Sequence, residues 1–109
     1  MDGLDITVLF FPVNNDITVT AQFPEITDGT GMTAQFWYKD DRYTPDSDPS
    51  TNMYQNSIIK DNQGNWFSTF NIPGTANKIA GSFWWRVDAV DAQSKRRTAA
   101  NGPVLVQAS

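Results

Sequence analysis

Aspartate is concentrated between residues 40 and 52, the part of the chain with the composition closest to that of a metal site. Its candidate ligands are Asp40, Asp41, Asp46 and Asp48. Clustered carboxylates suit calcium, and Asp46-Ser47-Asp48 has the alternate-residue spacing of a calcium loop. Such a loop also needs a glycine at its sharp turn and a closing bidentate glutamate, and residues 40–52 contain neither. We therefore interpret this segment as a solvated loop and predict no metal site.

The residue types that dominate enzyme active sites are missing from the sequence. The chain has no histidine and no cysteine, so the commonest general base, the main nitrogen ligand for metals and the thiol nucleophile are all absent. Paired carboxylates could still hydrolyse glycosidic bonds. However, Glu25 is the sole glutamate, and the aspartates concentrate in loops and turns. We predict a protein that is not an enzyme and that uses no cofactor.

Two tryptophans indicate an interaction surface instead. Alternation within residues 33–39 and 82–90 places Trp37 and Trp84 on the face opposite the core, where they could stand side by side if the two strands are neighbours. Outward tryptophan beside arginine is typical of a partner anchor. We therefore predict a partner-binding site formed by Trp37, Lys39, Trp84 and Arg86. The alternative is that Arg86 stacks on a tryptophan and shields it from water.

Strand patterns account for most of the chain, and no sustained helical stripe occurs. They fall in seven segments separated by turn signals: residues 4–10, 17–23, 33–39, 54–60, 66–72, 82–90 and a last strand ending at 104–106. The strongest hairpin signal is Asp61-Asn62-Gln63-Gly64-Asn65. The expected inward residues are Phe36, Tyr38, Trp66, Phe70, Phe83, Trp85 and Val87. This spacing predicts an all-β, antiparallel β-sandwich that occupies residues 1–109 as one domain.

The order of the motifs resembles a known group of proteins. The C-terminal segments Trp85-Arg86-Val87-Asp88-Ala89-Val90-Asp91 and Gly102-Pro103-Val104-Leu105-Val106 are similar to the last hairpin of fibronectin type III and immunoglobulin-like domains. Together with residues 31–38, 61–73 and 81–88, they look like the small immunoglobulin-like virion proteins of tailed bacteriophages. The resemblance spans residues 16–106, without the bridging cysteines of antibody domains. It implies an immunoglobulin-like β-sandwich of about seven strands.

The resemblance also implies a role on a virus particle. We expect a capsid (head) decoration protein on the particle surface, bound to the major capsid protein and capable of self-association on the particle. One alternative is an accessory domain of the tail, neck or baseplate. The other is an adhesion or carbohydrate-binding module, in which exposed aromatic rings stack on sugars. The phage family carries no catalytic residues that could be transferred to this sequence.

Charge and hydropathy argue against two other classes of partner. The formal net charge of −4 disfavours binding to nucleic-acid phosphates. The basic cluster Lys95-Arg96-Arg97 is interpreted as a solvated turn. The apolar runs are far shorter than the roughly 20 residues of a membrane span, and no signal-peptide pattern follows Met1. We expect synthesis in the host cytoplasm and neither a nucleic-acid nor a membrane partner.

Overall fold

The computed structural model describes residues 9–76 and 79–108. These residues form eight β-strands and one short 3₁₀ turn: β1 (Leu9–Pro12), β2 (Ile17–Gln22), β3 (Thr33–Lys39), β4 (Asn52–Ser57), β5 (Ile59–Lys60), β6 (Trp66–Ile72), η1 (Gly74–Ala76), β7 (Gly81–Val90) and β8 (Arg96–Gln107). Within these ranges, no helix has the length and apolar character that crossing a membrane requires.

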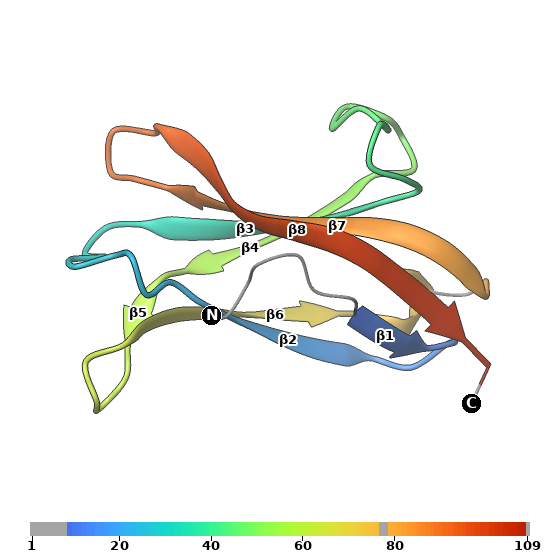
Figure 1. Ribbon diagram of the computed structural model, residues 1–109, viewed down its shortest axis with the longest axis horizontal. Coiled ribbons are helices and arrows are strands. Elements are labelled where there is room, and N and C mark those ends of the chain that lie inside the picture. The colour runs from blue at the N-terminus through green and yellow to red at the C-terminus, as the bar shows by residue number, and fades with distance from the viewer. Residues whose placement is uncertain (1–8, 77–78, 109) are drawn as a thin grey trace.

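The strands form two sheets packed face to face (Figure 1). The large sheet has the order β1-β8-β7-β3-β4, and the small sheet has the order β2-β6-β5. Paired strands are antiparallel except for β1, which runs parallel to β8. Since β2 pairs with β6 while β3 pairs with β7, the chain repeatedly crosses between the sheets, as in an immunoglobulin-like sandwich. The predicted fold class is confirmed.

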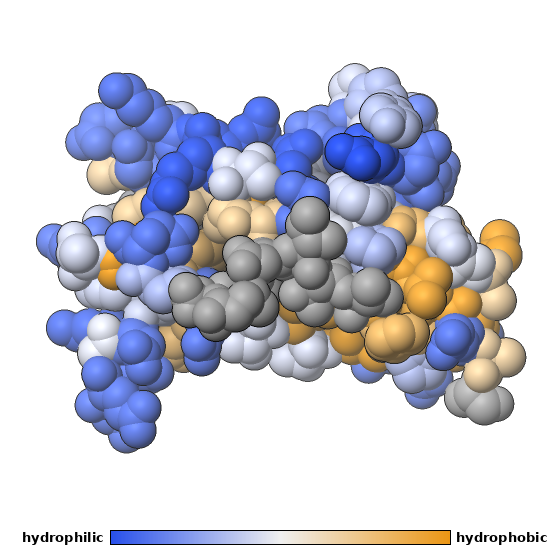
Figure 2. Space-filling model, in the orientation of Figure 1, coloured by the Kyte–Doolittle hydropathy of each residue, from blue (hydrophilic) through white to orange (hydrophobic). Residues whose placement is uncertain are grey.

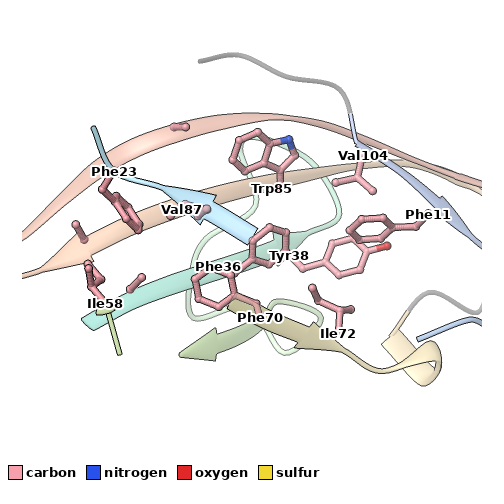
Figure 3. Close-up of a cluster of buried hydrophobic side chains, with 14 of the residues drawn as sticks. Phe11, Phe23, Phe36, Tyr38, Ile58, Phe70, Ile72, Trp85, Val87 and Val104 are labelled. Carbon is pink, nitrogen blue, oxygen red and sulfur yellow. The ribbon is translucent and has the colours of Figure 1, made fainter. Parts of the chain in front are cut away.

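Alternation along β3 and β7 decides which side chains enter the core. Phe36 and Trp85 are buried, and their parallel rings lie 6.2 Å apart between centroids. From the small sheet, Phe70 approaches Phe36 at 5.6 Å. Figure 3 shows these rings and Tyr38 gathered between the two sheets. Burying each large apolar side chain contributes about 1.5–3 kcal/mol, so this aromatic cluster holds the sheets together.

The β5–β6 hairpin forms where the sequence predicts it. The Asp61 carboxylate accepts hydrogen bonds from the backbone N–H groups of Gln63 and Asn65, each at 2.9 Å. Gly64 has a φ angle of 84°, a conformation that glycine adopts without a steric penalty. The turn therefore depends on Asp61 for its hydrogen bonds and on Gly64 for its backbone angle.

The prediction of one strand over residues 54–60 is wrong in its extent, because the segment contains the end of β4 and all of β5. The chain leaves the large sheet after β4 and enters the small sheet at β5. Ile58, between the two strands, is buried, and its N–H donates to the Met32 carbonyl at 3.0 Å. A continuous strand is excluded because the buried Ile58 anchors the crossing between the sheets.

The first strand presents the opposite face from the one its pattern predicts. The alternation groups Phe10 with the apolar face, but Phe10 is 61% exposed and Phe11 is 2% exposed. The register places Phe11 beside Val106, which is buried, and Phe10 beside Leu105. A slip of one residue exchanges the two faces of a strand. The remaining apolar residues of this predicted strand, Leu4, Ile6 and Val8, lie outside the described residues.

Two local predictions also need correction. Trp66, expected in the core, is only half-buried, and the Lys60 ammonium lies 5.6 Å from its ring centroid. Arg96 and Arg97, expected in a turn, begin β8, while the turn ends at Lys95, whose carbonyl accepts from the Asp91 N–H at 2.9 Å. The basic side chains are therefore held on a strand, where they can lie over neighbouring strands.

Candidate functional site

The four residues predicted to bind a partner lie on β3 and β7, which are neighbours in the large sheet, as expected. All four are on its outer face, because the alternate positions of both strands are buried. Across the strands, Trp37 is opposite Arg86, and Lys39 is opposite Trp84. The tryptophans are therefore diagonal neighbours and do not face each other directly. Each has a cationic side chain as its cross-strand partner.

Trp37 is covered by two arginines. The guanidinium of Arg86 lies 5.1 Å from its ring centroid, and that of Arg96 lies 5.7 Å away. The indole N–H of Trp37 is buried, with no hydrogen-bond partner among the described residues. This stacking is the arrangement that the alternative interpretation anticipated for Arg86. Trp37 therefore offers a partner little apolar surface, and the aromatic contribution to the site depends on Trp84.

Arg86 is held by two carboxylates. Its Nε and Nη2 donate to Asp88 at 3.0 and 2.9 Å, and its Nη1 and Nη2 donate to Asp46 at 3.0 and 2.8 Å. Asp88 is 1% exposed and also accepts from the Thr98 hydroxyl at 3.0 Å. Paired donors of this kind fix a guanidinium in one orientation. Arg86 is therefore a rigid part of the face, fixed between β7 and the loop that carries Asp46.

Lys39 is buried, contrary to its expected place beside an exposed tryptophan. It is 6% exposed; its ammonium donates to the Thr44 carbonyl at 2.8 Å and forms an ion pair with Asp46. The covering residues come from the loop of residues 40–51, which joins β3 to β4 (Figure 1). Because a buried ammonium needs partners, Lys39 and Arg86 together fasten this loop to the sheet through Asp46.

Near neutral pH the Asp46 carboxyl stays ionised, so its ion pairs with Lys39 and Arg86 are kept. Hydrogen bonds from Arg86 hold the pKa of the Asp46 carboxyl at about 2, below the ordinary 3.8. A lowered carboxyl pKa contributes stability that is fully present above the unfolded-state value and is lost as the pH falls through the folded-state value. The loop should therefore stay attached down to about pH 4 and loosen between about pH 4 and pH 2.

Trp84 belongs to a more exposed part of the face. The guanidinium of Arg42, from the loop of residues 40–51, lies 5.3 Å from the Trp84 ring centroid and 5.3 Å from that of Tyr43. Tyr43 is 81% exposed, and Trp84 is half-buried. Contacts between arginine and aromatic rings contribute about 0.5–1 kcal/mol at exposed sites. They orient Arg42 above the sheet without neutralising its charge.

Beside Trp84 the face contains an open pocket of about 300 Å³. It is lined by Lys39, Arg42, Trp84, Arg86, Thr98 and Asn101. Three of these residues are cationic, one is aromatic, and Thr98 and Asn101 carry polar side chains from β8. The pocket therefore combines positive charge with a ring surface and hydrogen-bonding groups, which suits a polar or anionic group of a binding partner.

An apolar stripe continues from the pocket across β8 to β1. The register places Trp84 opposite Pro103 and Phe10 opposite Leu105. All four side chains point outward, because the intervening Val104 and Phe11 are buried. Figure 2 shows hydrophobic residues gathered at the end of the sandwich where β1 lies. Exposed apolar area next to a polar pocket is typical of an interaction surface.

The aspartates of residues 40–51 act within the loop. Asp41 accepts from the Tyr43 N–H at 2.8 Å, and Asp48 accepts from the Ser50 N–H at 2.9 Å. Asp46 is committed to the cations beneath the loop, as described above. Among the described residues, no three acidic, histidine or cysteine side chains gather closely enough to hold a metal ion. The carboxylates stabilise turns and fasten the loop, which leaves calcium without a set of converging ligands.

We expect the melting temperature to be the same with and without millimolar EDTA. The loop is held by Lys39 and Arg86, so its order does not require a metal ion. Differential scanning fluorimetry with EDTA, calcium and magnesium arms measures this directly. A clear rise in melting temperature with calcium, through stabilisation by a bound ligand, would contradict the prediction.

The comparisons with known proteins add no further constraint. No protein-family model matches the chain, and no curated protein sequence matches it either. Function is therefore argued from the outer face of the large sheet. Sequence reasoning missed three residues of this face: Arg42, Asp46 and Arg96. Alternation does place Asp88 on this face beside Arg86, two positions away on one strand, but it does not predict that Asp88 is buried.

Proposed function

We propose that this protein is a structural component of a bacteriophage virion, a capsid decoration protein that attaches to the major capsid protein through the outer face of the large sheet. The observation that carries the proposal is the half-buried Trp84, held under Arg42 beside an open pocket and an apolar stripe. Aromatic and arginine side chains dominate the energy of protein interfaces. The motif order of residues 16–106 and the acidic net charge support a place on a particle surface.

A carbohydrate-binding function is the second candidate, and the exposed ring of Tyr43 favours it. Tyr43 and Trp84 both lie near the pocket, where Asn101 could bond a sugar hydroxyl. Glycan-binding modules use such rings for stacking and such amides for specificity. On this hypothesis the chain would recognise a surface glycan of the host, and the apolar stripe would have no role.

Quantitative mass spectrometry of purified particles tests the proposal against this alternative. A decoration protein should be found on the particle in a copy number comparable with that of the major capsid protein. Its absence from purified particles would overturn the proposal. A few copies per particle would favour the tail, neck or baseplate. A glycan array run in parallel separates the second candidate, which requires saturable binding to a particular sugar.

We expect Trp84→Ala to weaken attachment to undecorated particles by roughly thirtyfold. Truncating an interface anchor costs about 2 kcal/mol or more, and each 1.4 kcal/mol is a tenfold loss of affinity. Co-sedimentation over a range of protein concentrations gives the ratio of dissociation constants. Ile59→Ala is the matched control, because Ile59 is an exposed apolar residue of the small sheet, 52% accessible.

The Ile59 variant should bind like the parent protein. If Trp84→Ala also binds like the parent, then attachment does not use this face. A larger loss of affinity for Ile59→Ala than for Trp84→Ala would indicate that the interface lies on the small sheet.

A further inference from the structure

The pocket beside Trp84 carries positive charge that the protein itself does not neutralise. Three cations line it, namely Lys39, Arg42 and Arg86, and a fourth, Arg96, pairs with the carboxylates that hold Arg86. The carboxylates paired with them in the described residues are Asp46 and Asp88. These six side chains have a net positive charge. The loop of residues 40–51 also carries Asp40, Asp41 and Asp48, which accept hydrogen bonds from loop residues, so the charge available to an anionic group is that of the cation without a carboxylate partner.

The free charge is localised on Arg42. Arg86 has four hydrogen bonds to carboxylates, and Lys39 is buried under the loop. By contrast, Arg42 is exposed and has no carboxylate partner among the described residues; its contacts are with the rings of Tyr43 and Trp84. The adjacent Asp41 is turned into the loop, where it accepts from the Tyr43 N–H and the Thr44 hydroxyl.

The side chains beneath Arg42 also make the pocket a rigid receptor. Asp46 and Asp88 fix the guanidinium of Arg86 at the pocket wall, and the Asp46–Lys39 ion pair holds the loop that carries Arg42. Arginine binds a carboxylate through two parallel N–H donors. A carboxylate entering the pocket would meet Arg42 already positioned by its aromatic neighbours, with little further ordering required.

We propose that this pocket binds the carboxylate of a glutamate or aspartate side chain in an extended segment of the protein partner. This inference rests on the proposed function and names the chemistry of the partner at the same face. The apolar stripe identifies the rest of the segment. Phe10 lies two strand spacings from Trp84 and is offset from it by two residues along β8, a diagonal on the order of 12 Å. An apolar side chain three or four residues from the acidic one therefore reaches Phe10 and Leu105.

The same stripe favours a protein segment over an acidic sugar as the occupant. A monosaccharide fills the pocket and leaves Pro103, Leu105 and the 61% exposed Phe10 in water. A peptide covers both the charge and the apolar surface. Burial of this apolar surface adds to the charge pairing.

The test is a titration of the intact protein, labelled with ¹⁵N, with three probes. They are the capped peptide acetyl-Glu-Thr-Ser-Leu-amide, its glutamine counterpart acetyl-Gln-Thr-Ser-Leu-amide, and glucuronate as the acidic sugar. We expect the glutamate peptide to shift the indole N–H of Trp84 and the Nε–H of Arg42, saturably and more weakly at high salt. The glutamine peptide should bind at least fivefold more weakly.

Two charge-matched variants complete the experiment. Arg42→Gln should lower the affinity for the glutamate peptide at least fivefold. Lys95→Gln, which removes an exposed cation from the β7–β8 turn, should leave this affinity unchanged. Equal binding of the two peptides, an effect of Lys95→Gln as large as that of Arg42→Gln, or no shift at Trp84 would overturn the inference. Binding of glucuronate without binding of the glutamate peptide would overturn it in favour of a sugar.

The outcome is separable from that of the proposed function. If the protein is abundant on purified particles but the glutamate peptide does not bind, then the pocket chemistry is wrong and the attachment stands. If the peptide binds as expected but the protein is absent from particles, then the virion function is wrong and the pocket serves a partner elsewhere.

Discussion

Replacing Trp85 with alanine is expected to lower the free energy of unfolding by about 3–5 kcal/mol, the range for a large aromatic residue removed from a core. Trp85 is 1% exposed and stacks on Phe36 in the centre of the sandwich. A domain of this size is stable by about 5–15 kcal/mol. The substitution therefore removes a large share of the total, and the variant should be partly unfolded at 37 °C if the parent lies at the low end.

Urea denaturation followed by tryptophan fluorescence measures this change. Trp84→Ala is the control, because Trp84 is the preceding residue on β7 with its ring on the outer face; it should cost about 1 kcal/mol. Trp85→Ala is therefore expected to lower stability more than Trp84→Ala does, whereas Trp84→Ala is the variant expected to weaken attachment. If Trp84→Ala proves the more destabilising of the two, the inner and outer faces of β7 are exchanged.

Removing the carboxylate of Asp88 should cost about 3 kcal/mol, the lower end of the range for breaking a buried ion pair. Asp88 is 1% exposed and accepts hydrogen bonds from Arg86 and Thr98. In Asp88→Ala, Arg86 keeps only Asp46 as a partner and loses the contact that fixes it to its own strand. The Arg86 N–H groups that donate to Asp88 are then left without this acceptor in a partly buried position over Trp37, which costs free energy.

Asp48→Ala is the matched control for this prediction. The Asp48 carboxylate makes its hydrogen bonds to Ser50 at an exposed turn, so its loss should cost under about 1 kcal/mol. A double-mutant cycle with Arg86→Met isolates the coupling between Asp88 and Arg86. Equal effects of the two aspartate substitutions, or a coupling near zero, would mean that the buried network does not stabilise the domain.

The alternation of apolar and polar residues was enough to predict β2, β3, β6 and β7, because a strand half-buried in a sandwich imposes a period of two. Phe36 and Trp85 could be placed in the core on this basis. The pattern failed where it was ambiguous. Phe10-Phe11 offers two equivalent aromatic residues, and only the pairing of β1 with Val104, Leu105 and Val106 decides which one points inward.

The candidate site was predicted in its location but not in its contacts. Alternation placed Trp37, Lys39, Trp84 and Arg86 on one face, which the sheet register confirms. It could not predict that the loop of residues 40–51 folds back over that face, because Asp46 meets Arg86 across 40 positions of sequence. The burial of Lys39 follows from this folding back of the loop, which brings Asp46 to its ammonium.

The parallel pairing of β1 with β8 has a mechanical consequence. Leu9 lies beside Val104, and Pro12 lies beside Gln107, so a tension that pulls Leu9 and Gln107 apart acts along the two strands in opposite directions. The hydrogen bonds between the strands then share the load in shear and must break together, whereas a hairpin pulled at its open end separates one bond at a time. A domain loaded in this way should resist stretching along its length.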